Sequence, residues 1–494
     1  MHYKTGTDRH QMFLFNSLED CIEEDNPVRL IDALINKVVS DNPEKFAYKG
    51  QNICGRKSYS PSVLLKLYLY GYLNRIPSSR RLETESRRNI ELKWLLNDQH
   101  PDFKTIADYR KDNKEAIRSI TLGFREFLRK EGYIEGNKIT FDGSKIKACT
   151  SGDKEITTSF IHAKMQNLEE QLEGYLTQLH GNDHAENLEE ELDNLCRHLD
   201  IDKAVLEEIS SLRSKVKELE GVSRKLEEEN RNSYFPNDPD ARLMKSRDGF
   251  IPAYNVQVGT DAKHKMIVLS EVTTNENDYN LLQDNCEKVI EQINTVPQII
   301  LADTGYGNMQ QIETLETQDL EIQCVIPRQI SACKEKDKEN GIQFTYDSQS
   351  DSYICTQGKK LVRKKRTSLV GNTIYLVYQA SNIDCKTCSL RNKCHPSKAR
   401  EGRSLKVPDN HQYRNRYDQK LSSPDSKKLI NERKELIEHV FGNLKRWMGK
   451  VPILLTSKEK VQIEIDLYAT AYNIRRLISI TPVPQLLMKC RNCT

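Results

Sequence analysis

The sequence lacks any long hydrophobic run. None of its 494 residues lie in a stretch that approaches the roughly 18–20 apolar residues of a membrane-spanning helix. The N-terminal letters MHYKTGTDRHQ also lack the basic-then-apolar pattern of a signal peptide. We therefore expect a cytoplasmic protein without a membrane partner.

Aromatic residues are scarce, and the net charge is small. Phe, Trp and Tyr make up 7% of the chain, and the formal net charge is +3. That value conceals a division, because residues 152–230 carry 20 acidic and 9 basic residues, a net charge of −11. The rest of the chain is therefore at +14, and residues 356–406 alone hold 13 basic and 2 acidic residues. A basic body with an acidic insertion favours a nucleic-acid partner, although basic clusters can also be only solvated surface.

The chain contains thirteen cysteines, more than we expect to be paired in disulfides in a reducing compartment. Nine of them are scattered, whereas four cluster in the segments YICTQGKK and CKTCSLRNKC. Thiolates in a tetrahedral array select zinc, so these four predict a structural zinc ribbon, with His395 as an alternative ligand. Free thiols on a loop are the other interpretation. The four cysteines are Cys355, Cys385, Cys388 and Cys394.

Residues 1–135 are predicted to be helical. Apolar residues recur at helical spacing over 26–39, 60–73, 76–96 and 102–132. A compact helical domain with one arginine-rich helix is suited to binding DNA, and a solvated helix face is the alternative. The arginines in question are Arg80, Arg81, Arg87 and Arg88.

A first strand is predicted over 138–142, and the acidic insertion follows it. From Val205 to Leu226, apolar residues step by four and three, the spacing of a coiled-coil seam. We therefore expect residues 152–230 to form a coiled-coil helical insertion.

Strand patterns return after this insertion. The runs 253–261 and 264–272 predict a hairpin, a helix is expected over 279–293, and 297–303 is a further apolar strand. Strand, hairpin, helix, strand, helix and strand is the order of an RNase H-like sheet. The predicted fold is α/β: an RNase H-like mixed sheet with flanking helices, preceded by an all-helical N-terminal domain and interrupted by two insertions. The predicted divisions are 1–135 (helical, DNA-binding), 136–151 with 231–329 and 426–480 (catalytic), 152–230 (coiled coil), 330–425 (basic and Cys-rich) and 481–494 (tail).

Three acidic residues stand out. Asp142 and Asp303 each end a short apolar run, and Glu438 lies in a segment with helical spacing. Two strand-borne Asp and one helix-borne Glu can hold a pair of Mg²⁺ or Mn²⁺ ions, which clamp the attacking and leaving oxygens of a phosphoryl displacement. A single Asp at a strand end is more often a turn residue. Glu432 and Glu435 are alternatives for the third acid.

Asp278 lies in the segment NENDYN, between the predicted hairpin and the next helix. The common role of an Asp at such a junction is to cap the helix, which is our prediction. A position beside the metals is the alternative.

Long segments of the chain resemble those of DDE transposases from bacterial insertion sequences. Residues 15–32, FNSLEDCIEEDNPVRLID, are similar to the family's N-terminal opening. Residues 60–96 and 100–111 are similar to its helical N-terminal domain, and residues 238–257 to the link back into its sheet. The resemblance covers nearly the whole chain and is to the RNase H-like group with a Tyr-Arg-Glu-Lys signature.

The resemblance implies a role for each acidic residue. Asp142 and Asp303 match the first and second catalytic Asp, and Glu438 matches the catalytic Glu. Lys445 lies seven residues further on, along the same helix face, and matches the signature's lysine, which contacts a DNA phosphate.

The chain departs from the signature at two positions. Asn431 stands where Tyr is usual, and Lys434 stands where Arg is usual, with Arg433 as a substitute. Lysine keeps the charge but lacks the planar fork of arginine, so the departures concern phosphate contacts more than metal ligands. The run GKKLVRKKR also suits DNA phosphates, through Arg363, Lys364, Lys365 and Arg366.

The activity implied by the resemblance is metal-dependent strand cleavage at the ends of a mobile element, followed by transfer of a 3′-hydroxyl to target DNA. The implied partners are double-stranded DNA, as terminal inverted repeats and as target, and a second copy of the chain in a homodimer. The implied location is the bacterial nucleoid. The alternatives are an RNase H-like nuclease without strand transfer, and a catalytically silent DNA-binding protein descended from a transposase.

Overall fold

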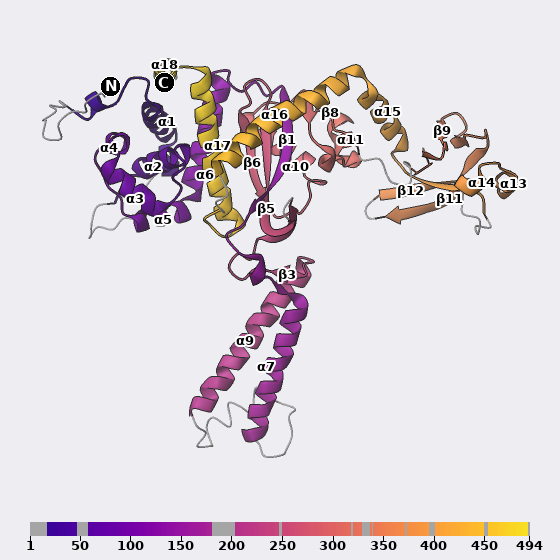
Figure 1. Ribbon diagram of the computed structural model, residues 1–494, viewed down its shortest axis with the longest axis horizontal. Helices are drawn as coiled ribbons and strands as arrows, with labels where there is room; N and C mark the ends of the chain where they lie inside the picture. The colour runs from indigo at the N-terminus through magenta and orange to yellow at the C-terminus, as the bar shows by residue number, and fades with distance from the viewer. Residues whose placement is uncertain are drawn as a thin grey trace, which may run out of the picture.

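The computed structural model shows a central sheet surrounded by helices, from which a helical hairpin and a smaller sheet project (Figure 1). The described residues are 17–46, 58–179, 203–246, 249–317, 320–328, 336–337, 339–370, 373–394, 401–448 and 453–492. In these ranges no helix is long and apolar enough to cross a membrane.

The N-terminal part consists of helices with recognisable start signals. The side chain of Asn26 accepts a hydrogen bond from the backbone N–H of Val28 at 2.9 Å and caps the first helix. Pro61 opens the second, where its missing N–H costs no hydrogen bond. The single helix predicted over 76–96 is wrong, because the chain breaks at Asn89, whose side chain caps a separate helix. The helices are α1 Pro27–Asp41, α2 Pro61–Leu73, α3 Ser79–Arg88, α4 Ile90–Leu95, α5 Phe103–Asp112 and α6 Lys114–Lys130, with 3-10 turns at Glu19–Cys21 and Pro43–Phe46.

A six-stranded mixed sheet forms the centre of the molecule. Its order is β4-β5-β1-β7-β8, and β6 also pairs with β5. β1 is antiparallel to β5 and parallel to β7, and β7 is parallel to β8. The predicted hairpin is found as β5 and β6. The strands are β1 Lys138–Lys147, β4 Arg242–Ser246, β5 Gly249–Asp261, β6 Ile267–Thr273, β7 Ile299–Leu301 and β8 Gln323–Val325.

Helices cover both faces of this sheet. α16 crosses β1, β5, β7 and β8, and α17 lies against β6. Their apolar residues, such as Phe441 and Val461, belong to the same buried cluster as Val256 of β5. α10 and α11 pack with the opposite face, which Phe141 belongs to. Because side chains alternate along a strand, Asp142 points to the side of α16. These helices are α10 Leu282–Ile293, α11 Met309–Thr317, α16 Pro424–Met448, α17 Lys458–Ile480 and α18 Val483–Asn492, with a 3-10 turn at Thr304–Tyr306.

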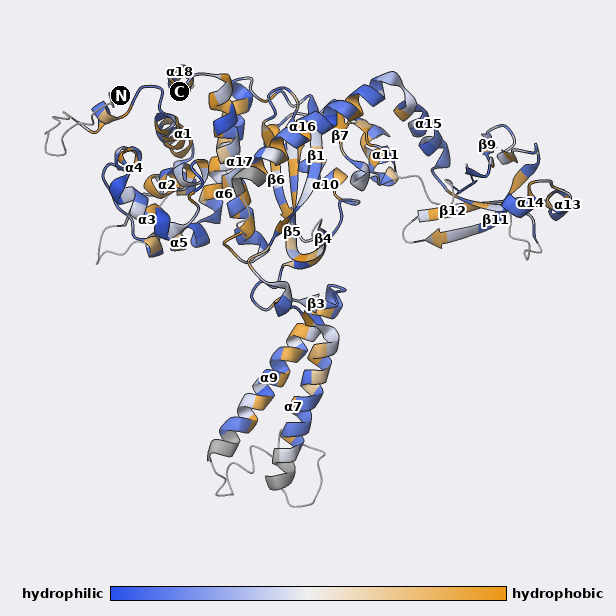
Figure 2. Cartoon of the chain, viewed as in Figure 1, coloured by the Kyte–Doolittle hydropathy of each residue, from blue (hydrophilic) through white to orange (hydrophobic). Residues whose placement is uncertain are grey.

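α17 also joins the N-terminal helices to the sheet. It contacts α2 and α6 as well as β6, so one helix packs on both parts. Figure 2 shows hydrophobic residues concentrated in the central strands and in the helices around them, whereas α3 and α15 are mostly hydrophilic.

Two further units project from the sheet (Figure 1). α7 (Thr158–Leu179) packs along α9 (Lys203–Glu228), where Ile209 and Leu212 are buried. Residues 180–202 of this predicted coiled coil lie outside the described residues. A two-stranded ribbon of β2 (Ile156–Thr157) and β3 (Ser233–Tyr234) stands at its base, next to a 3-10 turn at Gly152–Lys154.

The second unit is a five-stranded antiparallel sheet of order β13-β12-β11-β10-β9. The basic, Cys-rich sequence of residues 330–425 predicts neither a five-stranded sheet nor α15. Its elements are β9 Phe344–Asp347, β10 Ser352–Cys355, β11 Lys360–Val370, β12 Thr373–Ala380, α13 Asn382–Lys386, α14 Arg391–Cys394, β13 Ser404–Pro408 and α15 His411–Ser422.

Candidate active site

Asp142 and Asp303 come from neighbouring parallel strands. Thr140 of β1 is paired with Leu301 of β7, and each Asp follows two residues later along its strand direction. Because side chains alternate along strands in register, the two aspartates fall side by side where β7 ends. Asp303 Oδ1 accepts a hydrogen bond from the backbone N–H of Gly305 at 2.9 Å. Two of the three predicted acids are therefore brought together.

The carboxylate of Asp142 is largely buried and lies near other negative charges. Burial, followed by the charge of Asp303, raises its pKa to about 6, and Asp278 adds a smaller effect. The guanidinium of Arg433 and a hydrogen bond from the backbone N–H of Gly143, 2.9 Å from Asp142 Oδ1, act in the opposite direction. Repulsion between neighbouring carboxylates is the kind of strain that a bound cation relieves.

Glu438 is exposed on α16, the helix that crosses β1 and β7. In the described part of the chain, no three His, Cys, Asp or Glu side chains are close enough to hold one metal ion, so Glu438 is not gathered with the two aspartates. Of the alternative acids, Glu435 is exposed, and Glu432 is paired with Lys138, whose Nζ lies 2.8 Å from Glu432 Oε1.

Asp278 does not cap α10, so that prediction is wrong. The N-cap residue of α10 is Leu281, and no side chain makes a capping hydrogen bond there. Asp278 Oδ1 instead accepts hydrogen bonds from the side-chain amides of Asn255 and Gln257, both at 2.7 Å. These partners lie more than twenty residues earlier on β5, which is why local spacing did not reveal them.

Lys145 is a cation held among these acids, and the sequence did not single it out. Its Nζ is buried without a hydrogen-bond partner among the described residues, and it lies 3.9 Å from Asp278 Oδ1. Burial lowers the pKa of Lys145, whereas the charges of Asp278, Glu276, Asp303 and Asp142 oppose that shift. Its place three residues after Asp142 on β1 was the only signal in the sequence.

The donor set fits a hard divalent cation. Carboxylate oxygens are the ligands that Mg²⁺ and Mn²⁺ prefer. Two glycines keep space open beside them: a Cβ on Gly305 would lie 2.9 Å from Asp303 Oδ1, and a Cβ on Gly143 would lie 2.5 Å from Asp278 Oδ1. Any larger side chain at these positions would push the carboxylates aside.

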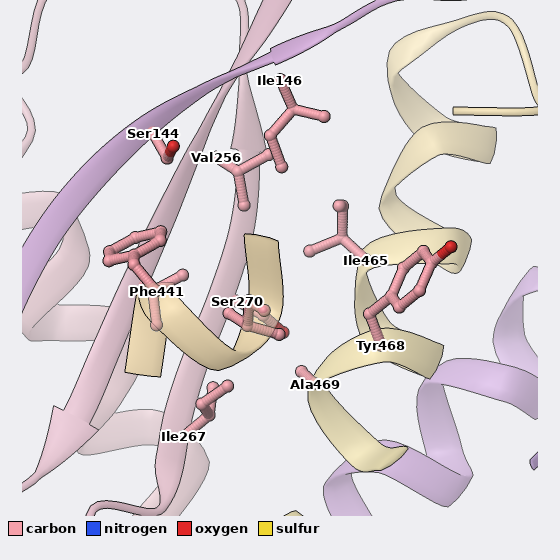
Figure 3. Close-up of a pocket in the computed structure, with 11 residues that line it drawn as sticks. Ser144, Ile146, Val256, Ile267, Ser270, Phe441, Ile465, Tyr468 and Ala469 are labelled. Atoms are coloured by element: carbon pink, nitrogen blue, oxygen red, sulfur yellow. The ribbon is translucent and has the colours of Figure 1, made fainter. Parts of the chain in front are cut away.

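A small pocket lies deeper on the α16 side of the sheet, but it is not part of this constellation. It is enclosed between the sheet, α16 and α17, and Ser144, Val256, Phe441, Ile465 and Ala469 line it (Figure 3). Its lining is almost entirely apolar and contains no carboxylate. We regard it as imperfect packing beneath α16.

The four clustered cysteines do not form a metal site in the described structure. Cys355 ends β10, and the other three lie on or between α13 and α14. Burial raises the pKa of Cys394, and the nearby charges of Cys385 and Cys388 add to this after other contributions. Three or more of these sulfurs are not close enough to share one ion among the described residues. His395 lies outside those residues.

The arginines of α3 lie on an exposed helix face. The Arg80 guanidinium sits 5.4 Å from the centroid of the Phe103 ring, and Arg81 is exposed. Arg87 and Arg88 pair with glutamates of the same helix while remaining largely exposed.

The basic residues of β11 lie in a bulge. Arg363 is paired with Tyr378 and Thr367 with Leu376, so three residues of β11 stand opposite one of β12. Extra residues in a bulge are unpaired and change the direction of nearby side chains. The three are Lys364, Lys365 and Arg366, and all are exposed.

The basic residues that correspond to the Tyr-Arg-Glu-Lys signature lie on α16. Lys434 is exposed, and Arg433 is half-buried with its Nε unpartnered among the described residues. The side chain of Lys445 lies outside the described part of the structure.

Two family models match the chain. One, a transposase domain (DUF772), matches residues 16–112, and the other, a transposase DDE domain, matches residues 354–478. No curated protein matches. Among solved structures, the cryo-EM structure of the piggyBac transposase synaptic complex with hairpin DNA is similar at 10% identity and a TM-score of 0.26, over 92% of this chain and 82% of that one, which is too slight to support an argument. Transposase models thus match both the N-terminal helices and the C-terminal part of the chain, and these two matches support a DDE transposase of an insertion sequence.

Proposed function

We propose that the chain catalyses metal-dependent cleavage of DNA strands at the ends of its element and transfer of those ends to target DNA. The observation that carries this proposal is the parallel register of β1 and β7, which puts Asp142 beside Asp303 at the end of β7. The transposase family models support the same reaction class.

In this proposal Asp142, Asp303 and Glu438 hold two Mg²⁺ or Mn²⁺ ions. Bound there, the ions would activate the attacking oxygen and stabilise the leaving one. Asp142, in the middle of β1, and Asp303, in the turn that follows β7, would supply oxygen ligands, and Glu438 would reach the ions from α16. Arg433, whose charge already acts on Asp142, is placed to offset negative charge near the site.

The proposed catalytic unit is an RNase H-like fold. Its support is the strand order β6-β5-β1-β7-β8, with an antiparallel first part and parallel β1, β7 and β8. In this division residues 136–151, 231–329 and 426–480 form the catalytic domain, interrupted by the coiled coil of 152–230 and the basic unit of 330–425.

Double-stranded DNA is the proposed partner. The exposed arginines of α3 would contact the terminal repeats through the N-terminal domain of residues 1–135. Lys434, Lys445 and the bulged residues of β11 would contact phosphates nearer the reaction. Because two element ends must meet, we expect a homodimer on the DNA.

The role of β11 in DNA binding can be tested by salt dependence. Replacing Lys364, Lys365 and Arg366 by Gln should lower the slope of log K against log salt by about 0.9 for each DNA phosphate that the variant no longer neutralises. The same replacement of Lys215 and Lys217, on the acidic insertion, is the matched control and should leave the slope unchanged. An unchanged slope in the β11 variant would remove this strand from the DNA interface.

A structural zinc at Cys355, Cys385, Cys388 and Cys394 is a separate proposal, supported only by their spacing. Elemental analysis of the purified protein tests it. One zinc per chain, lost when Cys385 and Cys388 are both replaced by Ser, would support it, and a zinc-free, folded protein would refute it.

The reaction itself is tested with Mg²⁺, a DNA fragment that carries the element's terminal inverted repeats, and a target plasmid. Joined products support the transposase. Cleavage without joining supports an RNase H-like nuclease, and DNA binding without either product would mean a catalytically silent DNA-binding protein. Asp303→Asn is the matched inactive variant and should still bind DNA.

A further inference from the structure

Asp278 is fixed in place by a network of amides. Its Oδ1 accepts hydrogen bonds from Asn255 Nδ2 and Gln257 Nε2, both at 2.7 Å. Gln257 is held in turn, because its Oε1 accepts hydrogen bonds from Asn285 of α10 at 2.9 Å and from the hydroxyl of Tyr306. Asn255, Gln257 and Asn285 are almost completely buried. Such a connected network orients one carboxylate oxygen and leaves little freedom for the other.

The second oxygen of this carboxylate is free and points toward the site. No described residue donates a hydrogen bond to Asp278 Oδ2, and the side chain is 17% exposed. A Cβ built on Gly305 would lie 3.6 Å from Oδ2 and 2.9 Å from Asp303 Oδ1, so both oxygens border the same small space. An oriented oxygen with an open lone pair beside Asp303 is a ligand position.

Gly143 leaves the space in which the carboxylate of Asp278 lies against β1. It follows Asp142 on β1, opposite Gln257 of β5, and a Cβ there would lie only 2.5 Å from Asp278 Oδ1 and 2.7 Å from Gln257 Nε2. The carboxylate therefore occupies the space that any other residue's side chain would fill. The lack of a side chain at this position allows Asp278 to lie against β1 at the residue that follows Asp142.

Charge in this region is only partly offset. Lys145 Nζ is the nearest cation to Asp278, at 3.9 Å from Oδ1, which is too long for a hydrogen bond. An Asp serving only as a structural anchor would be expected to share its charge between both oxygens and close partners. Here Oδ1 accepts two hydrogen bonds, whereas Oδ2 accepts none from the described residues.

We propose that Asp278 is a further metal-binding carboxylate of this site, acting through Oδ2 beside Asp303, with Asn255 and Gln257 as the residues that position it. The proposal rests on the metal-dependent function proposed above. Since no three acids among the described residues are yet close enough to share an ion, Asp142 and Asp303 would rotate toward the ion, whereas Asp278 is already fixed.

Asp278→Asn gives a sharp test because the shape of the side chain is unchanged. The amides of Asn255 and Gln257 require an oxygen at Oδ1, so the new NH₂ group would occupy the position of Oδ2 and face the ion. We expect Mn²⁺ affinity, measured on the full chain by calorimetry and by electron paramagnetic resonance, to fall at least about tenfold. Gly143→Ala should lower it similarly, by displacing Asp278.

Asp284→Asn is the matched control. Asp284 lies on α10, is about half-exposed and pairs with Lys288, so its replacement should leave Mn²⁺ affinity unchanged. Thermal melting in EDTA separates binding from folding. A purely structural Asp278 would lower the melting temperature of Asp278→Asn and leave Mn²⁺ affinity intact, which would overturn the proposal.

Asp303→Asn separates this inference from the proposed function. If Asp303→Asn weakens Mn²⁺ binding and Asp278→Asn does not, Asp278 is not a ligand, although the metal site stands. If neither variant changes the affinity, the metal assignment itself is wrong. Weakened binding in Asp278→Asn and Gly143→Ala, with DNA binding intact in the absence of metal, would support the proposal.

Discussion

The central sheet carries two groups of carboxylates, and their surroundings are opposite. At the junction of α6, α17 and β6, Asp466 is buried and accepts hydrogen bonds from Arg118 at 3.0 Å and from Ser270 at 2.9 Å. Arg118 also pairs with Glu271. At the end of β7, by contrast, Asp142 and Asp303 have no arginine within ion-pairing distance among the described residues.

The difference shows how to separate structural acids from functional ones. Buried charges are normally matched by charges and hydrogen bonds of the protein itself, as around Asp466. The group around Asp142 is built from acids in excess of bases, and burial and the charge of Asp303 both raise the pKa of Asp142. Burial raises the pKa of Asp466 as well, but no neighbouring acid adds to that shift, and Arg118 and Arg125 oppose it. Acids whose charges the protein offsets only in part are candidates for binding a cation from solution.

The largest expected effect is on catalysis. Asp303→Asn removes one charge from the group of Asp142 and Asp303 and should reduce DNA cleavage with Mg²⁺ by about 10³-fold, the upper range for removal of one group that stabilises a transition state. Single-turnover cleavage of end-labelled terminal-repeat DNA measures this. DNA affinity should be unchanged, and near-normal cleavage would show that Asp303 is not at the reaction centre.

Replacing Asp466, whose charge is matched by Arg118, should instead lower the stability of the fold. Asp466→Ala removes the buried carboxylate that pairs with Arg118, and breaking a buried pair typically costs roughly 3–5 kcal/mol. Urea denaturation of the metal-free protein measures this decrease in the free energy of unfolding. Asp284→Ala, which removes an ion pair at the surface, should cost no more than about 1 kcal/mol. Equal decreases in the two variants would contradict the contrast between buried and exposed pairs.

Much of the metal-site hypothesis could be read from local patterns. Asp142 and Asp303 each end an apolar run in the sequence, and Asp303 indeed lies just beyond the end of β7. The prediction that the first strand ends at Asp142 is wrong, because β1 continues to Lys147. The pairing of β1 with β7 could not be derived from either segment alone, because more than 150 residues separate them. The order of strands and helices, which is that of an RNase H-like sheet, supplied that link.

Other features depend on contacts between residues that are distant in the sequence, so they could not be predicted from it. Asp278 lies in a polar segment in which capping was the simplest interpretation, and its partners on β5 become visible only when the sheet forms. The sheet of β9–β13 was missed because β11 is so basic that no apolar alternation is visible in it. Only the pairing with β12 and β10 makes it a strand.

Metal binding at Asp142 and Asp303 should stabilise the folded protein. At an Mn²⁺ concentration about 100 times the dissociation constant, binding to the folded state alone adds about 2.7 kcal/mol to the free energy of unfolding. Denaturation with and without Mn²⁺ measures this increase. Asp466→Ala should retain it, and the double variant Asp142→Asn with Asp303→Asn should not show it. An increase in that double variant would locate the metal elsewhere.

The smallest expected effect has the opposite sign to that of Asp466→Ala. In EDTA at pH 8, Asp142 is ionised, because its raised pKa of about 6 lies below that pH. Its charge is buried beside Asp303, so Asp142→Asn should raise the free energy of unfolding by about 1 kcal/mol, less than the nominal value of about 1.4 kcal/mol for each unit of pKa shift. Urea denaturation of both proteins in EDTA measures this. Adding saturating Mn²⁺ should reverse the order, because only the wild type keeps the full set of ligands. If Asp142→Asn is destabilising in EDTA, the protein itself already compensates the charge of Asp142, and the two groups of carboxylates do not differ in the way their surroundings indicate.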